Sequence, residues 1–474
     1  MAVAGFAPST LSGPRPTLVY GRRAHFMRYL SNPLRYMREN YAAYGPISAV
    51  VRDDPSQILA VGPEYNRVLL SDSALFYSIF DRILPEPLQR RGLGAGLLQM
   101  NGPQHKQHRR LIMPAFHRRQ VELYRDDMVS YTQDALDRWR PGQTLNISHE
   151  MQMLTLRIAC KTLFGLDATA QAEGVGRLIR QSMDTPFYSP KLALFPFDVP
   201  GAPFHRALRT TAQLNAELLA MIQRKRANPE QHYDVLATLI QARDEDGGAL
   251  SDYELLSHAG TLLIAGHETT ANTLAWTLLL LDQHPRVLAD LVDELDGTLG
   301  GAAPTIEQLR PDSARLPLLD RVIKESMRLL PTAAVGSRVS TGPFALGPYR
   351  FPRNTFINYS AFLTHRLPEL YDEPLRFQPE RWQRIDPSPY EYLPFGAGPR
   401  MCIGASFAIM ELKVALAMLL QRYRLALAPG ARVGWKMGIT LAPSNPLPMI
   451  VAAQDRRFSK GAVQGAIHEL VDLR

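Results

Sequence analysis

Cysteine is nearly absent from this chain of 474 residues, which contains only Cys160 and Cys402. The two are far apart in sequence, and Cys160 lies in an apolar stretch, residues 156–163, where a packed thiol is expected. Two such cysteines cannot supply the thiolates of an iron–sulfur cluster, and they do not suggest a disulfide framework. We therefore expect a protein of a reducing compartment, the cytoplasm.

Linkers and repeats are also absent from the sequence. No Ser/Gly-rich or low-complexity tract divides the chain, although its length would allow about three domains, and no period of roughly 20 to 50 residues recurs. The prediction is one large domain over residues 1–474, with its core at about residues 40–453. Residues 455–474 extend past that core, and the sequence assigns them no role.

A membrane anchor is not predicted either. Residues 1–16 lack the charged segment and apolar run of a signal peptide. The longest apolar tract, residues 255–281, has the length of a membrane span, but Glu268 stands in its middle. A carboxylate at the centre of a bilayer costs about 3 kcal/mol on insertion scales, so a buried helix is favoured over a membrane helix.

What the sequence has in abundance is helical periodicity, which dominates from about residue 100 onward. Short β-like runs lie at residues 47–51, 58–61 and 336–357. One helix stands out, because Ser251 and Glu254 form a capping box and the next stop is Pro285, roughly 50 Å further along a helix. A helix this long and apolar must be buried. The polar residues that interrupt it at positions 265–270 are therefore expected to have a function inside the protein, because burying them without partners is costly.

The most informative segment surrounds Cys402, at residues 395–404. Gly398 and Gly404 permit backbone angles closed to other residues and let the main chain approach a flat ligand, while Arg400 precedes the cysteine by two positions. Amide donors around the sulfur would stabilise a thiolate that binds iron. The alternative is an inert buried thiol beside a turn.

The complete pattern favours the iron ligand. Phe-x-x-Gly-x-Arg-x-Cys-x-Gly begins at Phe395, follows Tyr392-Leu393-Pro394, and precedes an apolar helical run at residues 405–420. Here the sequence resembles the cytochrome P450 superfamily, the haem-thiolate monooxygenases. The resemblance implies a mainly α fold with small β-sheets and a long central distal helix, haem b (iron protoporphyrin IX) as cofactor, and Cys402 as its axial iron ligand. The implied reaction inserts one atom of O2 into a hydrophobic small molecule, such as a fatty acid, terpenoid, steroid or polyketide.

The same resemblance implies roles for other residues. The motif Ala-Gly-x-Glu-Thr-Thr at residues 265–270 matches the distal oxygen pocket of the family, so Glu268 and Thr269 are expected to manage protons. The alternative for Thr269 is a hydroxyl bonded back to the helix carbonyl one turn earlier. The haem propionates need cationic partners, and the resemblance implies donors at four positions: His105, Arg109, Arg338 and Arg400. For His105 and Arg109 the alternative is a basic face that docks an electron donor.

A structural network is also implied. Glu325 and Arg328 lie three residues apart on one predicted helix, a spacing that by itself often marks a weak surface pair. Together with Arg381 in Pro379-Glu380-Arg381-Trp382, they resemble the buried ion-pair network of the family. We expect these three residues to be structural and not catalytic.

Substrate contacts are expected from four mostly apolar segments, residues 76–98, 262–269, 332–337 and 439–443. The charged exceptions are Arg82, Glu86 and Arg90. Residues 185–204, rich in aromatics and proline, suit a lid over the pocket, although static packing would explain the same composition.

Electrons are expected from separate proteins, because the sequence contains no flavin, nicotinamide or iron–sulfur fingerprint. The net charge is +8, and basic residues crowd residues 105–119 without the aromatic interleaving of a single-strand nucleic-acid binder. This favours an acidic ferredoxin or flavodoxin-type donor with its reductase over nucleic acid, and a solvated basic face is the alternative. The residues of that predicted docking face are Lys106, Arg110, Arg118 and Arg119.

Two other functions use the same haem. A peroxide-driven or isomerising enzyme has less need of the Glu268-Thr269 proton relay, and a haem gas sensor usually carries an output domain that this sequence lacks. Both are less consistent with the motifs than a monooxygenase.

Overall fold

The computed structural model describes residues 10–17, 21–80, 96–167, 174–183, 197–228 and 233–473. Its backbone contacts divide the chain into two compact units. The first comprises residues 1–79, 333–374 and 386–402, and the second comprises residues 80–332, 375–385 and 403–474. The single domain predicted for the whole chain stays a prediction, and each unit is described below by itself.

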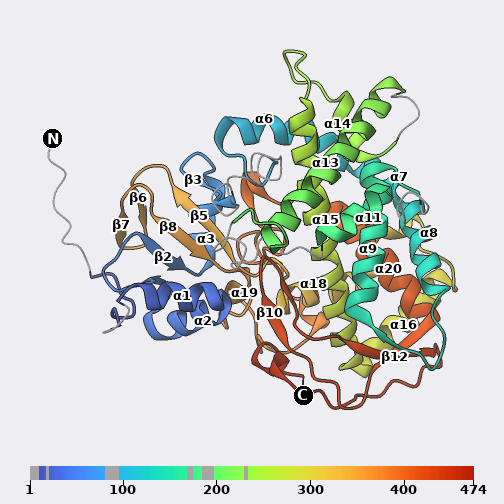
Figure 1. Cartoon of the computed structure of the whole chain (residues 1–474). Helices are drawn as coiled ribbons and strands as arrows, with labels where there is room; N and C mark the ends of the chain where they lie inside the picture. The colour runs from blue at the N-terminus through green and yellow to red at the C-terminus, as the bar shows by residue number, and fades with distance from the viewer. Residues whose placement is uncertain are drawn as a thin grey trace. The chain divides into compact units, whose positions relative to one another are not determined.

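The first unit contains a five-stranded sheet with the strand order β1-β2-β8-β5-β3 (Figure 1). Strands β2 and β8 are parallel, and the other neighbours are antiparallel. The strands are β1 (Ile47–Ala49), β2 (Gln57–Ala60), β3 (Phe76–Tyr77), β5 (Gly336–Ser340) and β8 (Phe356–Tyr359), with a hairpin of β6 (Phe344–Leu346) and β7 (Tyr349–Phe351). The β-like runs of the sequence therefore form strands, as predicted.

The first unit also contains helical elements. They are α1 (Arg23–Ser31), α2 (Pro33–Tyr44), α3 (Pro63–Ser71), α19 (Ala361–Thr364) and the 3₁₀ turn η6 (Gly398–Arg400). Leu69 and Leu70 of α3 join the sheet residues Ile58 and Ile357 in one buried apolar cluster. The sequence analysis did not predict α1 to α3, although a signal for α2 exists: Asn32 caps Arg35 N at 3.0 Å and Pro33 follows as the first helical residue.

The second unit is mainly helical, which agrees with the periodicity after residue 100. Its long helices are α6 (Gly102–Ile112), α8 (Arg125–Leu136), α9 (Ile147–Phe164), α11 (Gly174–Met183), α13 (Pro203–Ala227), α15 (Asp252–Asp282), α16 (Pro285–Leu299), α18 (Pro317–Leu329) and α20 (Ala405–Arg422). Shorter helical elements are η2 (Met113–Phe116), α7 (Arg118–Leu123), α14 (Val235–Gln241), α17 (Ile306–Leu309), η4 (Pro311–Ser313), η5 (Pro379–Gln383) and η7 (Ala466–Glu469).

Helix α15 is the central element of this unit and packs against α9, α18 and α20 (Figure 1). Its 31 residues span about 47 Å, and the predicted capping box of Ser251 and Glu254 is present. All residues from Thr270 to Asp282 are buried, which explains why this half is apolar on every side. Within the described ranges, no helix combines the length and the apolar character needed to cross a membrane.

The described part of the second unit also contains strands. The strands β4 (Thr144–Asn146), β12 (Pro448–Ala453) and β9 (Tyr423–Leu427) form an antiparallel sheet, and β10 (Trp435–Met437) and β11 (Leu441–Pro443) form a hairpin.

The C-terminal tail, for which the sequence suggested no role, is packed onto this unit. Val433 N donates to Gln464 O at 2.8 Å, Asp472 N donates to Leu375 O at 2.9 Å, and the Ile467 side chain is buried.

Candidate active site

Cys402 lies at the end of a tight turn in the first unit. Its N–H donates to the carbonyl of Phe395 at 2.8 Å, and Met401 N donates to Gly398 O at 3.0 Å. Gly396 and Gly398 both have φ of +68°, the region that favours glycine. A Cβ on Gly398 would overlap the carbonyl oxygen of Leu70, so glycine is required there for a second reason.

Cys402 is exposed, whereas Cys160 is buried in α9, and neither forms a disulfide. Cysteine is among the most frequently buried residue types, so an exposed cysteine on a constrained turn is unusual for a merely structural thiol. His365 Nε2 accepts a hydrogen bond from Leu393 N at 2.9 Å and thereby holds the start of the turn. The sulfur is thus presented by a turn of defined backbone geometry, as an axial metal ligand requires.

The polar interruption of α15 is also the part of the helix that opens to solvent. Ala265 is exposed and Leu262, Gly266 and Thr269 are half-buried. These four positions follow at three- and four-residue steps, so they share one face of the helix. Among the described residues, no heavy atom lies within 4 Å of the place where a Cβ on Gly266 would stand, apart from the helix's own backbone. A buried helix with one accessible face in its middle is suited to contact a ligand.

The acid and the alcohol on this helix have defined partners. Glu268 Oε1 accepts a hydrogen bond from Thr440 Oγ1 at 2.6 Å. Thr269 Oγ1 donates to Ala265 O at 2.8 Å, which is the back-bond that the sequence analysis kept as an alternative. That hydrogen bond uses the hydroxyl proton of Thr269 but leaves lone pairs on its oxygen.

The three residues expected to form a structural network lie together in the second unit. Glu325 and Arg328 share α18 and are fully buried, and Arg381 lies in η5. The two oxygens of Glu325 accept five hydrogen bonds at 2.8–3.0 Å, from Arg328 Nε, Arg328 Nη2, Arg381 Nε, the backbone N–H of Gln378 and Trp382 Nε1. The contributions of Gln378 and Trp382 were not predicted.

The residues expected to bind propionates are divided between the units. His105 and Arg109 lie one turn apart on α6 in the second unit, His105 buried and Arg109 half-buried. Arg338 on β5 and Arg400 in η6 belong to the first unit. Arg338 is 9% exposed, its guanidinium lies 5.4 Å from the centre of the Tyr359 ring, and it donates to Ser337 O at 2.9 Å. Within the described residues no carboxylate pairs with Arg338, so this buried cation lacks an anionic partner.

Two of the four basic residues predicted to dock an electron donor are paired within the chain. Arg110 bonds to Glu245, and Arg118 bonds to Asp312 at 2.8 Å. Lys106 and Arg119 are exposed. The positive charge of the predicted docking face is therefore partly balanced by acids of the same unit.

A buried histidine pair, which sequence reasoning missed, connects α6 to α15. His108 Nδ1 and His258 Nε2 are 2.9 Å apart, and His108 Nε2 lies 3.3 Å from Glu254 Oε1. Burial and the neighbouring His108 lower the pKa of His258 to about 3, although Glu254 opposes the shift, and burial lowers the pKa of His108 as well. Nothing in the sequence indicated this pair, because its members are 150 positions apart.

Because of this pair, we expect the free energy of unfolding to fall in acid. Since the pKa of His258 is about 3 in the folded chain and about 6.5 unfolded, the unfolded state binds the extra proton between these values. Above pH 6.5 this histidine leaves the free energy of unfolding unchanged. Below pH 6.5 the free energy of unfolding declines as the pH falls, with a slope approaching about 1.4 kcal/mol per pH unit. Replacing His258 by Gln should flatten this slope, as measured by denaturant unfolding between pH 4.5 and 7. His149→Gln, at an exposed position of α9, is the control; equal slopes in both variants would contradict the prediction.

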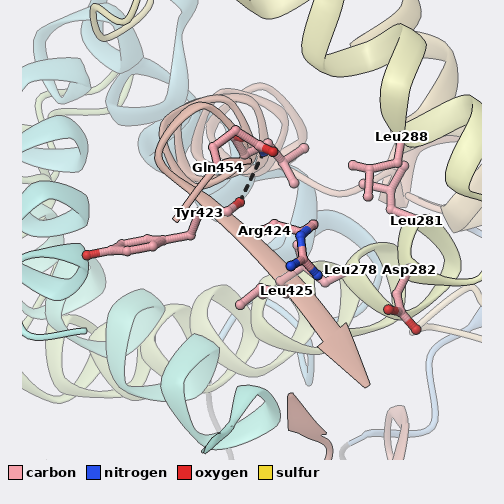
Figure 2. A pocket seen from close by; sticks show the side chains of 9 residues that line it. Leu278, Leu281, Asp282, Leu288, Tyr423, Arg424, Leu425 and Gln454 are labelled. Carbon is pink, nitrogen blue, oxygen red and sulfur yellow. Dashed lines mark hydrogen bonds between the residues drawn. The ribbon is translucent and has the colours of Figure 1, made fainter. Parts of the chain in front are cut away.

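A separate pocket lies at the C-terminal end of α15 (Figure 2). It is lined mainly by leucines, with Asp282 accepting from Leu427 N at 3.1 Å and Gln454 Nε2 donating to Tyr423 O at 3.4 Å. None of its lining residues belongs to a predicted substrate segment, and we attribute it to the packing of α15, α16, α20 and β9. The lining residues are Leu278, Leu281, Asp282, Leu288, Leu420, Tyr423, Arg424, Leu425 and Gln454.

Several predicted substrate contacts lie outside the described residues. These are residues 81–95, which include Arg82, Glu86 and Arg90, and residues 185–196 of the proposed lid. The segments 262–269, 332–337 and 439–443 are described, and Ile439 is 40% exposed at the tip of the β10–β11 hairpin.

Comparison with known proteins identifies the family. The family model described as Cytochrome P450 matches residues 11–446. The chain is a cytochrome P450. The resemblance stated from the sequence is confirmed, and so are the fold class and the assignment to oxidoreductases that use O2.

Relatives of this P450 include bacterial oxygenases. It is 34% identical to cyclooctat-9-en-7-ol 5-monooxygenase of Streptomyces melanosporofaciens, over 90% of this chain and 92% of that protein. It is 31% identical to pentalenene oxygenase of Streptomyces avermitilis, over 90% of this chain and 93% of that protein. A solved haem domain, cytochrome P450DA, matches with a TM-score of 0.80 at 25% identity, over 95% of this chain and all of that one.

The P450 family implies haem and O2, and features within each unit fit that cofactor. In the first unit, Cys402 is exposed, and among the described residues the buried Arg338 pairs with no carboxylate, a role that a propionate would fill. In the second unit, α15 offers an accessible face with open space beside Gly266. The residues present therefore suit a thiolate-bound haem.

Proposed function

We propose that this P450 is a monooxygenase that inserts one oxygen atom into a hydrophobic terpenoid. The accessible face of α15 carries this proposal, because it combines the apolar Leu262 and Ala265 with Thr269, and the acid Glu268 is the neighbouring residue. The relatives named for cyclooctat-9-en-7-ol and pentalenene support the terpenoid class over fatty acids, steroids and polyketides.

Haem bound through Cys402 would supply the redox chemistry of oxygen activation, which a thiolate promotes by donating electron density. The turn at residues 395–404 would orient the sulfur through its backbone geometry. The proposed propionate ligands are His105, Arg109, Arg338 and Arg400, whose N–H donors are matched to carboxylates. Gly398 and Gly404, which lack a Cβ, would let the backbone approach the ring, and Phe395 is assigned as a further contact of the cofactor.

Oxygen reduction consumes protons, and we assign their delivery to Glu268 and Thr269. Glu268 Oε1 already accepts from Thr440, while its partial exposure leaves the carboxylate accessible to exchange protons with water. Thr269 Oγ1 can accept a hydrogen bond in its present orientation, and rotation of the hydroxyl away from Ala265 O would let it donate. The loss of that one hydrogen bond costs only about 1 kcal/mol.

We assign the supply of electrons to a separate acidic ferredoxin or flavodoxin-type protein and its reductase. Lys106 and Arg119 remain exposed for such a donor, and the net charge of +8 favours an acidic one. Because such attraction is screened, the rate of reduction should fall as salt rises.

The test is turnover with and without an electron donor. Purified haem-loaded protein is supplied with ferredoxin, reductase and ¹⁸O2, and cyclic terpene hydrocarbons are compared with fatty acids and steroids of similar size. We expect one ¹⁸O atom in a terpenoid product and little product with hydrogen peroxide alone. Product formed only with peroxide, or a rearranged product without ¹⁸O, would favour the peroxide-driven or isomerising enzyme. Oxygenation restricted to fatty acids or steroids would overturn the substrate class.

A further inference from the structure

One face of α15 is joined to the β10–β11 hairpin by polar contacts at regular spacing. Glu268, Asn272 and Trp276 follow at four-residue steps and therefore lie on the same side of the helix. Asn272 Nδ2 and Glu268 Oε1 both bond to Thr440 Oγ1, and Trp276 Nε1 donates to Leu441 O at 3.1 Å. Two adjacent hairpin residues thus meet three successive turns of the helix.

The direction of the hydrogen bonds follows from the chemistry of the groups. The Asn272 amide donates to Thr440 Oγ1 at 3.2 Å and occupies a lone pair of that oxygen. A carboxylate can only accept, so the hydroxyl proton of Thr440 points at Glu268 Oε1, 2.6 Å away. The order is therefore Asn272 to Thr440 to Glu268, and each group makes the bond that its donors and acceptors permit.

The position of Thr440 is held by several contacts besides the one with Glu268. Thr440 is 6% exposed and Asn272 is 1% exposed. The hairpin backbone is held on both sides of the hydroxyl, because Leu441 N donates to Thr332 O at 2.9 Å and Gly438 N donates to Thr440 O at 3.1 Å. Glu268 is only half-buried, and a glutamate side chain has several rotamers to lose. The fixed partner in this contact is thus the threonine.

We propose that Thr440 is a positioning residue that holds the Glu268 carboxylate in one orientation for proton delivery. The inference rests on the proposed role of Glu268. Without the hydroxyl, Glu268 would sample other rotamers and its carboxylate would be correctly oriented for a smaller part of the time. Hydrogen bonds to charged groups are strong enough to predict a roughly tenfold effect.

The main experiment compares Thr440→Val, which keeps the shape and removes the hydroxyl, with Thr440→Ser, which keeps the hydroxyl. The measured quantity is product formed per electron pair consumed. We expect about a tenfold loss in the valine variant and recovery to within about twofold of wild type in the serine variant. Similar losses in both variants, or none in the valine variant, would overturn the positioning role.

A double-mutant comparison separates action through Glu268 from a general effect on packing. If Thr440 acts only through the carboxylate, Thr440→Val should cause no further loss in a Glu268→Ala background. An undiminished tenfold loss in that background would overturn the inference. If Glu268→Ala alone leaves the product yield unchanged, the proposed proton role of Glu268 fails, and the consequence inferred for Thr440 fails with it.

Hydrogen exchange gives a readout that does not involve turnover. In the haem-loaded protein, Thr440→Val and Glu268→Ala should each speed amide exchange in residues 435–443. Glu268→Gln should not, because its amide oxygen can still accept from Thr440. Unchanged exchange in both Thr440→Val and Glu268→Ala would show that the contact does not couple hairpin and helix, whatever the outcome for the proton role.

Discussion

Replacement of Cys402 by serine is expected to abolish the red-shifted absorption band that thiolate-bound ferrous haem shows with carbon monoxide. The turn would keep its backbone geometry, because the hydrogen bond from residue 402 to Phe395 O and the positive φ of Gly396 and Gly398 do not depend on sulfur. A serine oxygen cannot donate the electron density of a thiolate. Loss of turnover should exceed the roughly 10–100-fold cost typical of residues that only orient a metal ligand.

The matched control for this experiment is Cys160→Ser. Cys160 is buried in α9, so the variant loses some packing but should retain the carbon monoxide band. The measurement is the difference spectrum of both variants at equal haem content. An unchanged band in Cys402→Ser would refute the assignment of the axial ligand.

Replacement of Glu325 by glutamine is expected to destabilise the second unit and to reduce haem content. The carboxylate accepts five hydrogen bonds in a fully buried site, two of them from Arg328 and one from Arg381. A neutral amide removes the negative charge that both buried guanidinium groups contact and turns an NH2 toward their donors. Removing one partner of a buried ion pair typically costs about 3–5 kcal/mol.

The free energy of unfolding from denaturant titration and the ratio of haem to protein would measure this loss. Glu39→Gln is the control, because Glu39 and Arg28 form an ion pair of similar length, 2.9 Å, at 50% and 60% side-chain exposure. That surface pair should contribute less than about 1 kcal/mol. Comparable losses in the two variants would mean that burial does not govern the Glu325 network.

Much of the fold was accessible from the sequence because the signals were local. The Ser251 capping box and the stop before Pro285 predicted α15, and the β-like runs became β1, β2 and the strands from Gly336 onward. Helices α1 to α3 were missed because short helices are weakly specified by their own periodicity, although Asn32-Pro33 marked the start of α2.

For the candidate site, too, only the features with a local sequence signal were predicted. Motifs indicated Cys402, Glu268, Thr269 and the Glu325 group, but they did not indicate what these residues touch. Thr440 is 172 positions from Glu268, and no spacing rule relates them. The same holds for Gln378 and Trp382 on Glu325 and for the His108–His258 pair.

The sequence by itself determined the family, the cysteine expected to bind iron, and the long helix with a polar interruption, because each depends on residues close together along the chain. Only the tertiary structure decided that Thr440 bonds to Glu268, that Arg110 and Arg118 are paired with acids, and that the C-terminal tail packs against residues 375 and 433. The physical reason is that a contact between distant segments depends on how helices and strands pack together. The local propensity of a residue for helix or strand does not specify that packing.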